Sequence, residues 1–155
     1  MRKVRRASGL AVIAACGLAV AACGGSVTIS SAQSCLQQAG YGVTVVPASE
    51  VANGGAENRG PGQTGELWVG LHGARPTTID QAAATVAFFD SPAHARSEAN
   101  GENSTGNNTD AIGSVTVQPG SPLFNSVIAS TPTHTRAGLT AALKSALAKI
   151  ESCVS

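Results

Sequence analysis

The stretch E-L-W-V-G-L-H, residues 66–72, is the clearest β-strand in the sequence. Successive side chains of a strand point to opposite faces of a sheet, so Leu67, Val69 and Leu71 fall on one face and Trp68 and His72 on the other. The run A-A-T-V-A-F-F at 83–89 predicts a second strand. Because this run is apolar on both faces, we expect it near the centre of a sheet.

Further elements are predicted on both sides of this pair of strands. Residues 34–39 predict a short helix that stops at Gly40, and residues 41–46 and 114–118 predict strands. Ser91 is a natural N-cap, and Pro92 suits the first turn of a helix that we expect to reach about residue 100. The intervening segments 47–66, 101–113 and 119–133 are predicted to be loops, because they are rich in Gly, Asn, Ser, Thr and Pro.

The C-terminal segment predicts the longest helix, from about Thr135 to Cys153. Its apolar residues recur at three- and four-residue spacing, which is typical of an amphipathic helix; they are Leu139, Leu143, Leu147 and Ile150. The element order is therefore α-β-β-β-α-β-α. This order predicts an α+β fold over residues 33–155, with one mostly antiparallel sheet of about four strands and helices packed on one face.

The N-terminus has the three parts of an export signal. Residues 1–6 are basic, and residues 7–22 form an uncharged, largely apolar run that is shorter than the roughly 20 residues needed to span a bilayer. A cluster of small residues follows, and then Gly-rich polar sequence. This pattern predicts a cleaved signal over residues 1–22 rather than a permanent transmembrane helix.

The end of this leader, V-A-A-C-G at 20–24, resembles the lipobox of bacterial lipoproteins. The resemblance covers the leader only, and it implies that the signal is cut before Cys23, whose thiol receives diacylglycerol, and that the new N-terminus is acylated. Residues 23–32 are then a lipid anchor and a short flexible tether. The Ala-, Gly- and Val-rich remainder is similar in style to small lipoproteins of high-GC Gram-positive bacteria.

Three other interpretations of the leader stay open. The sequence I-A-A-C-G at 13–17 is also similar to a lipobox, but it leaves an apolar run of only about nine residues. The triplet A-V-A at 19–21 fits ordinary secretion, and Arg5-Arg6 fits a twin-arginine signal poorly. The number of cysteines favours lipidation of Cys23. A cut before Cys23 removes Cys16, and the lipid occupies the Cys23 thiol, so no odd thiol is left in an oxidising compartment.

The remaining cysteines, Cys35 and Cys153, predict a disulfide, because exported domains use such pairs. This bridge would close a loop of nearly the whole domain and would stabilise it by about 4–5 kcal/mol in the chain-entropy model. Two buried free cysteines are the alternative structural interpretation. A redox dithiol is disfavoured, because there is no C-x-x-C sequence.

Charge and motifs exclude several classes of function. Four of the ten basic residues lie in the leader and all nine acidic residues lie beyond it, so the mature domain has a net charge of about −3. It has no basic stripe for nucleic acid. No nucleophile elbow, P-loop or zinc motif is present, so we predict no cofactor, no metal and no catalytic residue.

Two polar pairs are candidates for function. Trp68 and His72 share the strand face opposite the apolar stripe and form a candidate binding patch, although Trp68 under a loop is the favoured structural interpretation. His94 and Glu98 share a helix face, either as a metal or acid–base pair or as exposed polar residues, the second being favoured.

These observations predict a lipoprotein on the extracytoplasmic face of the cell membrane. Its expected role is that of a non-enzymatic binding or interaction module, with a protein or a small molecule as partner. The alternative is a small cell-envelope enzyme, whose site would assemble only in three dimensions from residues such as His72, His94 or His134 with Asp90.

Overall fold

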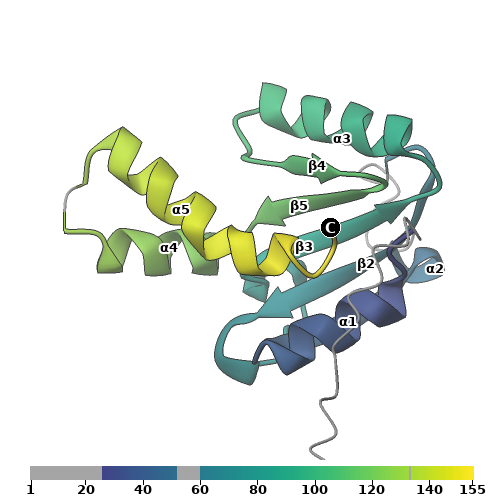
Figure 1. Ribbon diagram of the computed structural model, residues 1–155, viewed down its shortest axis with the longest axis horizontal. Helices are drawn as coiled ribbons and strands as arrows, with labels where there is room; N and C mark the ends of the chain where they lie inside the picture. The colour runs from purple at the N-terminus through teal and green to yellow at the C-terminus, as the bar shows by residue number, and fades with distance from the viewer. Residues whose placement is uncertain (1–25, 52–59, 133) are drawn as a thin grey trace, which may run out of the picture.

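The computed structural model describes residues 26–51, 60–132 and 134–155 (Figure 1). One five-stranded antiparallel sheet has the strand order β1-β2-β3-β5-β4. The strands are β1 (Gly42–Pro47), β2 (Gln63–Gly70), β3 (Ala84–Phe89), β4 (Asp110–Ile112) and β5 (Val115–Pro119). The predicted α+β class and antiparallel sheet are confirmed, and β3 is the central strand as expected. The sheet has five strands rather than four, because residues 101–113 include β4.

The described residues contain more helices than the sequence predicted, and α1 and α3 are longer than expected. They are α1 (Ile29–Gln38), α2 (Ala48–Val51), α3 (Pro92–Ser104), α4 (Ser121–Ser130) and α5 (Arg136–Glu151), with short 3₁₀ turns η1 (Leu71–Gly73) and η2 (Ile79–Gln81) between β2 and β3. None of the helices in these residues is long and apolar enough to cross a membrane.

The main core lies between one face of the sheet, here called the core face, and three helices, α1, α4 and α5. Leu67 and Val69 of β2 are fully buried there, as the strand alternation predicts. The helices bring their own apolar residues to this face, at the spacing expected of a buried helical stripe. These are Ala32, Leu36, Leu123, Val127, Leu143, Leu147 and Ile150.

Helix α3 packs on the opposite face of the sheet, here called the second face. Its buried Ala95 clusters with Ala87 and Phe89 of β3, which alternate with the core-facing Val86 and Phe88. Helices therefore cover both faces, and the prediction of helices on one face is wrong for α3. The second face of β3 could accept a helix because Ala87 and Phe89 make it apolar at that end.

The folded domain begins earlier than expected, because residues 29–32 of the predicted tether lie in helix α1. The Thr28 hydroxyl accepts a hydrogen bond from the Ser31 backbone N–H at 3.1 Å, and the Ser31 hydroxyl accepts one from the Thr28 N–H at 3.0 Å. This reciprocal pair satisfies two free backbone donors, so the helix starts at Ile29. Residues 29–32 belong to the folded domain, and Ala32 is fully buried.

Cys35 in α1 and Cys153, just after α5, have sulfur atoms 2.06 Å apart, which is a disulfide-bond distance. The two cysteines are 118 positions apart in the sequence. The pairing predicted from the sequence is therefore the one that the structure brings together. It ties the first helix of the domain to the end of the last helix.

The segment 119–133, predicted to be turn-rich, contains helix α4. Pro122 lies in the first turn of this helix, where a missing N–H costs nothing because that group has no intrahelical partner. Leu123 and Val127 are four residues apart, so they lie on the same side of the helix, and both are buried. The apolar spacing was that of a helix, and the proline marked a helix start rather than a turn.

Candidate functional site

The second face of the sheet is mainly polar where α3 does not cover it. Trp68 lies between Thr44 of β1 and Thr85 of β3 in the strand register. Glu66 occupies the same face two residues earlier and pairs with Ala87, which in turn pairs with Thr116 of β5. The face opposite the core therefore presents hydroxyl, carboxyl and indole groups from four neighbouring strands, rather than an apolar layer.

A cavity of about 280 Å³ lies on this face, and we call it the Glu66 groove. Its floor comes from β2, β3 and β5, one wall comes from α3, and η2 supplies Ile79 at the rim. The lining residues are Gln63, Glu66, Ile79, Thr85, Ala87, Glu98, Glu102, Thr109, Thr116 and Gln118. Lysine, arginine and histidine are missing from this lining.

Glu66 is a buried carboxylate at the floor of the groove, with 7% of its surface exposed. Its Oε1 accepts a hydrogen bond from the Trp68 indole Nε1–H at 2.6 Å, and its Oε2 accepts one from the Gln63 amide at 3.1 Å. Burial raises the pKa of Glu66 above its usual range, and the two hydrogen bonds oppose this rise without cancelling it. Both partners are neutral, and no positively charged residue lines the groove to balance the charged form of Glu66.

Helix α3 adds two more carboxylates at the wall of the groove. Glu98 and Glu102 are four residues apart and therefore share a helix face. The Glu102 carboxylate accepts a hydrogen bond from the Asn107 amide. Desolvation and the nearby charge of Glu102 raise the pKa of Glu98. In the described segments, no hydrogen-bond donor reaches the Glu98 carboxylate.

Thr109 closes the groove beside β4 and has an unsatisfied hydroxyl. The side-chain amide of Asn103 bonds both the backbone N–H and the carbonyl of Thr109, each at 2.8 Å, and so fixes the end of α3 against the start of β4. Thr109 is 3% exposed, and its Oγ1 has no hydrogen-bond partner. A buried hydroxyl without a partner costs free energy that a bound polar group would recover.

The structure brings Trp68 together with Glu66 rather than with His72. Strand β2 ends at Gly70, so the alternation that was expected to carry His72 onto the Trp68 face stops before it. His72 lies in η1 with a left-handed backbone, at φ 52°, and its side chain is exposed. Trp68 is half-buried on the second face.

His94 pairs with a different acid from the one predicted. Its Nδ1 lies 2.6 Å from Asp90 Oδ1, four residues before it, whereas Glu98 faces the groove. The hydrogen bond from His94 is the main cause that lowers the pKa of Asp90. His134 is exposed between α4 and α5. Within the described parts of the chain, no group of three or more His, Cys, Asp or Glu side chains could hold a metal ion.

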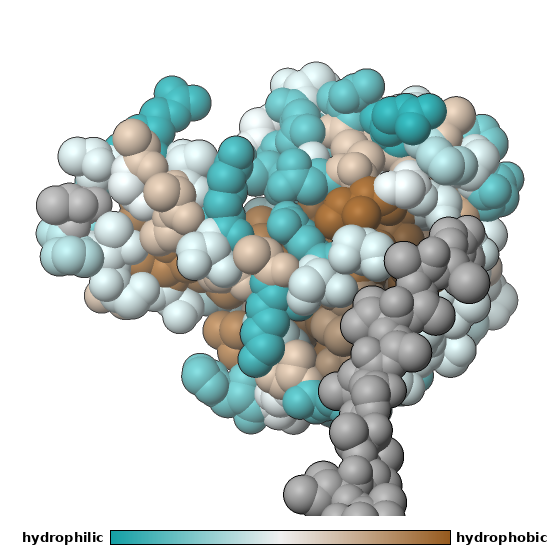
Figure 2. All heavy atoms as spheres, viewed as in Figure 1, coloured by the Kyte–Doolittle hydropathy of each residue, from teal (hydrophilic) through white to brown (hydrophobic). Residues whose placement is uncertain are grey.

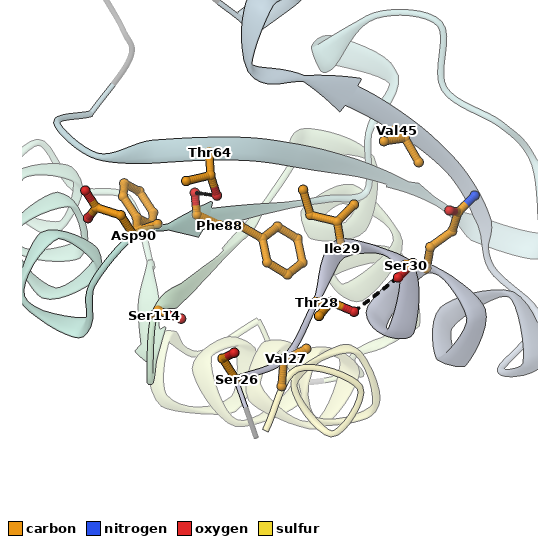
Figure 3. Close-up of a pocket in the computed structure, with 12 residues that line it drawn as sticks. Ser26, Val27, Thr28, Ile29, Ser30, Val45, Thr64, Phe88, Asp90 and Ser114 are labelled. Atoms are coloured by element: carbon orange, nitrogen blue, oxygen red, sulfur yellow. Dashed lines mark hydrogen bonds between the residues drawn. The ribbon is translucent and has the colours of Figure 1, made fainter. Parts of the chain in front are cut away.

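A second and more open cavity, of about 660 Å³, lies where the described chain begins (Figure 3). The Phe88 ring projects into it toward Ile29, Val27 lies beside Ser26, and Asp90 lies at the far end (Figure 3). On the side of the molecule seen in Figure 2, apolar residues reach the surface between polar ones.

Comparison of the chain with models of protein families, with curated proteins and with solved structures finds no match.

The sequence placed Glu66 on the Trp68 face but suggested no role for it, and it gave no indication that Glu98 or Thr109 lines the same cavity. One signal was present for Glu66, because a carboxylate two positions from a tryptophan on one strand must share its face. The contribution of α3 had no such local signal. It depends on which face of the sheet the helix covers.

Proposed function

We propose that the protein is a lipid-anchored binding module on the extracytoplasmic face of the cell membrane, and that its ligand binds in the Glu66 groove. One observation carries the ligand site: a buried carboxylate, a carboxylate without a donor and an unsatisfied hydroxyl line one cavity. Folded domains satisfy most of their buried polar groups internally. Three unsatisfied or uncompensated groups in one place favour a ligand that completes them.

The anchor in this proposal is Cys23, which lies outside the described residues. The leader pattern supports it, and so does the position at which the domain begins. Cys23 is only three positions before Ser26, so the two are at most about 11 Å apart. A diacylglyceryl group with a further acyl chain holds a protein firmly on a membrane. The cavity of Figure 3, which Ser26 lines, then lies at the membrane-proximal end of the domain.

The anchoring can be tested with two matched cysteine variants. Cys23→Ala should move the protein from the membrane fraction to the soluble fraction. Cys16→Ala changes the other cysteine of the leader and should leave the mature protein on the membrane. Loss of membrane attachment in Cys16→Ala and not in Cys23→Ala would assign the anchor to the wrong cysteine. Attachment of both variants would contradict lipid anchoring through a single cysteine.

The ligand site can be tested by nuclear magnetic resonance on the mature chain with Cys23→Ala, which keeps it in solution. A panel of small cationic, anionic and neutral polar compounds is titrated into the labelled protein. We expect at least one chemical class to perturb the resonances of Thr85, Thr116 and the Trp68 indole. Perturbation confined to Val27, Ile29 and Phe88 would instead assign ligand binding to the cavity of Figure 3.

A small cell-envelope enzyme is the second candidate, and the His94–Asp90 pair favours it. A carboxylate that holds a histidine ring in place is a common feature of general bases. Both side chains are about half exposed, at 44% and 53%, so water screens them and the pair lacks an enclosed reaction site. The enclosed Glu66 groove therefore favours ligand binding over catalysis.

A further inference from the structure

We propose that the Glu66 groove selects an organic cation, and that the ammonium group of an alkylamine binds between the carboxylates of Glu66 and Glu98. This inference rests on the ligand site proposed above and names its chemical class.

The charges around the groove decide the sign of the ligand. Three carboxylates line the cavity, from Glu66, Glu98 and Glu102, and the lining has no basic side chain to balance them. Opposite charges attract strongly where burial limits screening by water. An anion would be repelled by all three carboxylates, and a neutral ligand would leave the Glu98 carboxylate without a charged partner.

The acceptors that remain free match an ammonium group. An alkylammonium ion has three N–H donors and no acceptor. Glu98 receives no hydrogen bond from the described residues, and the Thr109 hydroxyl has an unused oxygen. Each Glu66 oxygen accepts one hydrogen bond from a neutral group and keeps capacity for another. One ammonium can therefore complete groups that the protein leaves incomplete.

The groove also has apolar surface for the carbon chain of such a ligand. Ala87 lies on the floor, and Ile79 lies at the rim with 54% of its surface exposed. Small-molecule sites are concave and combine apolar walls with a few polar groups. At about 280 Å³ the groove suits a short chain rather than a large ligand.

A bare divalent metal ion fits the groove less well. Calcium takes six or more oxygen ligands, which usually include several carboxylates. Glu66, Glu98 and Glu102 do not form a group close enough to hold a metal ion, since no such group of three occurs in the described residues. An ammonium group needs acceptors for only three N–H donors, so it requires fewer oxygen atoms around it than calcium does.

The experiment uses the single tryptophan as its reporter. Trp68 is the only tryptophan of the chain, so the protein has one indole N–H resonance, and this N–H donates directly to Glu66. The mature Cys23→Ala protein is titrated at pH 7 with n-butylammonium, 1-butanol and butyrate at matched ionic strength. We expect n-butylammonium alone to shift this resonance to saturation. A further titration with N-acetyl-lysine methylamide tests whether the groove binds the lysine side chain of a peptide as well as a small alkylamine.

Matched glutamate variants test which carboxylates bind. Glu66→Gln and Glu98→Gln should each weaken n-butylammonium binding by about tenfold or more, because a charge-assisted hydrogen bond is lost. In Glu66→Gln the backbone amides of Thr85 and Thr116 report binding in place of the indole. Glu50→Gln, an exposed acid in α2, is the control and should bind as the original protein does.

Each outcome has a definite meaning. Equal or stronger binding of 1-butanol or butyrate overturns the choice of a cation and leaves the groove as a ligand site. Equal weakening by Glu50→Gln also overturns it, because binding would then follow net charge alone. Binding of calcium in preference to n-butylammonium would replace the organic cation with a metal ion. No response to any probe would overturn both the cation and the groove.

Discussion

Among single residues, the proposed ligand site depends most on Glu66. A carboxylate with 7% exposure has lost most of its hydration, and only neutral donors contact its oxygens. Desolvation therefore raises the pKa of Glu66, as it does for the half-buried Glu98. Proteins keep such groups mainly where function needs them, since a glutamine would have a similar shape at lower cost.

The raised pKa of Glu66 predicts how stability depends on pH. A carboxyl whose pKa is raised in the folded state stabilises that state below the unfolded value of about 4.5. This contribution is lost as pH rises through the folded value. Glu66→Gln should therefore raise the melting temperature at pH 7 and change it little near pH 4.5. Thermal unfolding from pH 4.5 to pH 7 measures the difference.

The exposed acid Glu50 is the control for this measurement. Glu50→Gln should leave the pH dependence between 4.5 and 7 unchanged. Asp90 does not interfere in this range, because its pKa is lowered and its effect on stability lies at more acidic pH. A Glu66→Gln protein that is less stable than the original at pH 7 would contradict the account of Glu66 as an uncompensated buried charge.

At the scale of elements, local signals predicted the parts of the fold that depend on local contacts. The side chain of Ser91 caps α3 as expected, by accepting a hydrogen bond from the backbone N–H of His94 at 3.3 Å. The apolar spacing of α5 and the alternation in β2 also predicted their elements. Strand β4 was missed because its three residues carry no usable pattern. Helix α4 was missed because Pro122 also suits a turn.

The groove could be predicted only in part, because local sequence signals reveal only some of its residues. The sequence places Trp68 opposite the apolar stripe of β2, and the structure agrees. Residues from α3 and from the start of β4 reach that face through the packing of Ala95 and Ala99, and nothing in the sequence states which face of the sheet α3 covers. A site that assembles from separate elements depends on long-range packing, which local patterns do not encode.

Helix α4 offers a direct test of the corrected element. Leu123 and Phe124 are neighbours, but Leu123 is 5% exposed and packs in the main core, whereas Phe124 is 42% exposed. Leu123→Ala should lower the free energy of unfolding by about 2–4 kcal/mol, because it removes buried apolar atoms and leaves a cavity. Phe124→Ala should lower it by less than about 1 kcal/mol. Urea unfolding measures both, and a larger loss in Phe124→Ala would contradict the helix.

At the scale of the whole molecule, the Cys35–Cys153 bridge holds the ends of the domain together. It joins α1 to the end of α5 across 118 positions of sequence. The double variant Cys35→Ala/Cys153→Ala should lower the free energy of unfolding by about 2–5 kcal/mol, because the unfolded chain loses its cross-link. Unfolding in urea without reductant measures this loss. A difference below about 1 kcal/mol would mean that the bridge contributes little to the stability of the domain.

The anchor and the groove together define the proposed role. The domain begins within a few residues of the proposed lipid on Cys23, so its ligand is met close to the membrane surface. Residues 23–155 carry net negative charge, which also favours the approach of a cationic ligand. In the proposed role, the lipid would fix the place of binding, and the carboxylates of the groove would fix the chemistry of the ligand.

Lipid anchoring is tested most directly by intact mass spectrometry of the native protein extracted from membranes in mild detergent. We expect a chain that begins at Cys23 and carries the added mass of diacylglycerol and an acyl chain. The mass should also be lower by two hydrogens than that of the reduced chain, because Cys35 and Cys153 are joined. An unmodified chain that begins at Ala22, or a lipidated chain that begins at Cys16, would contradict the proposed anchor.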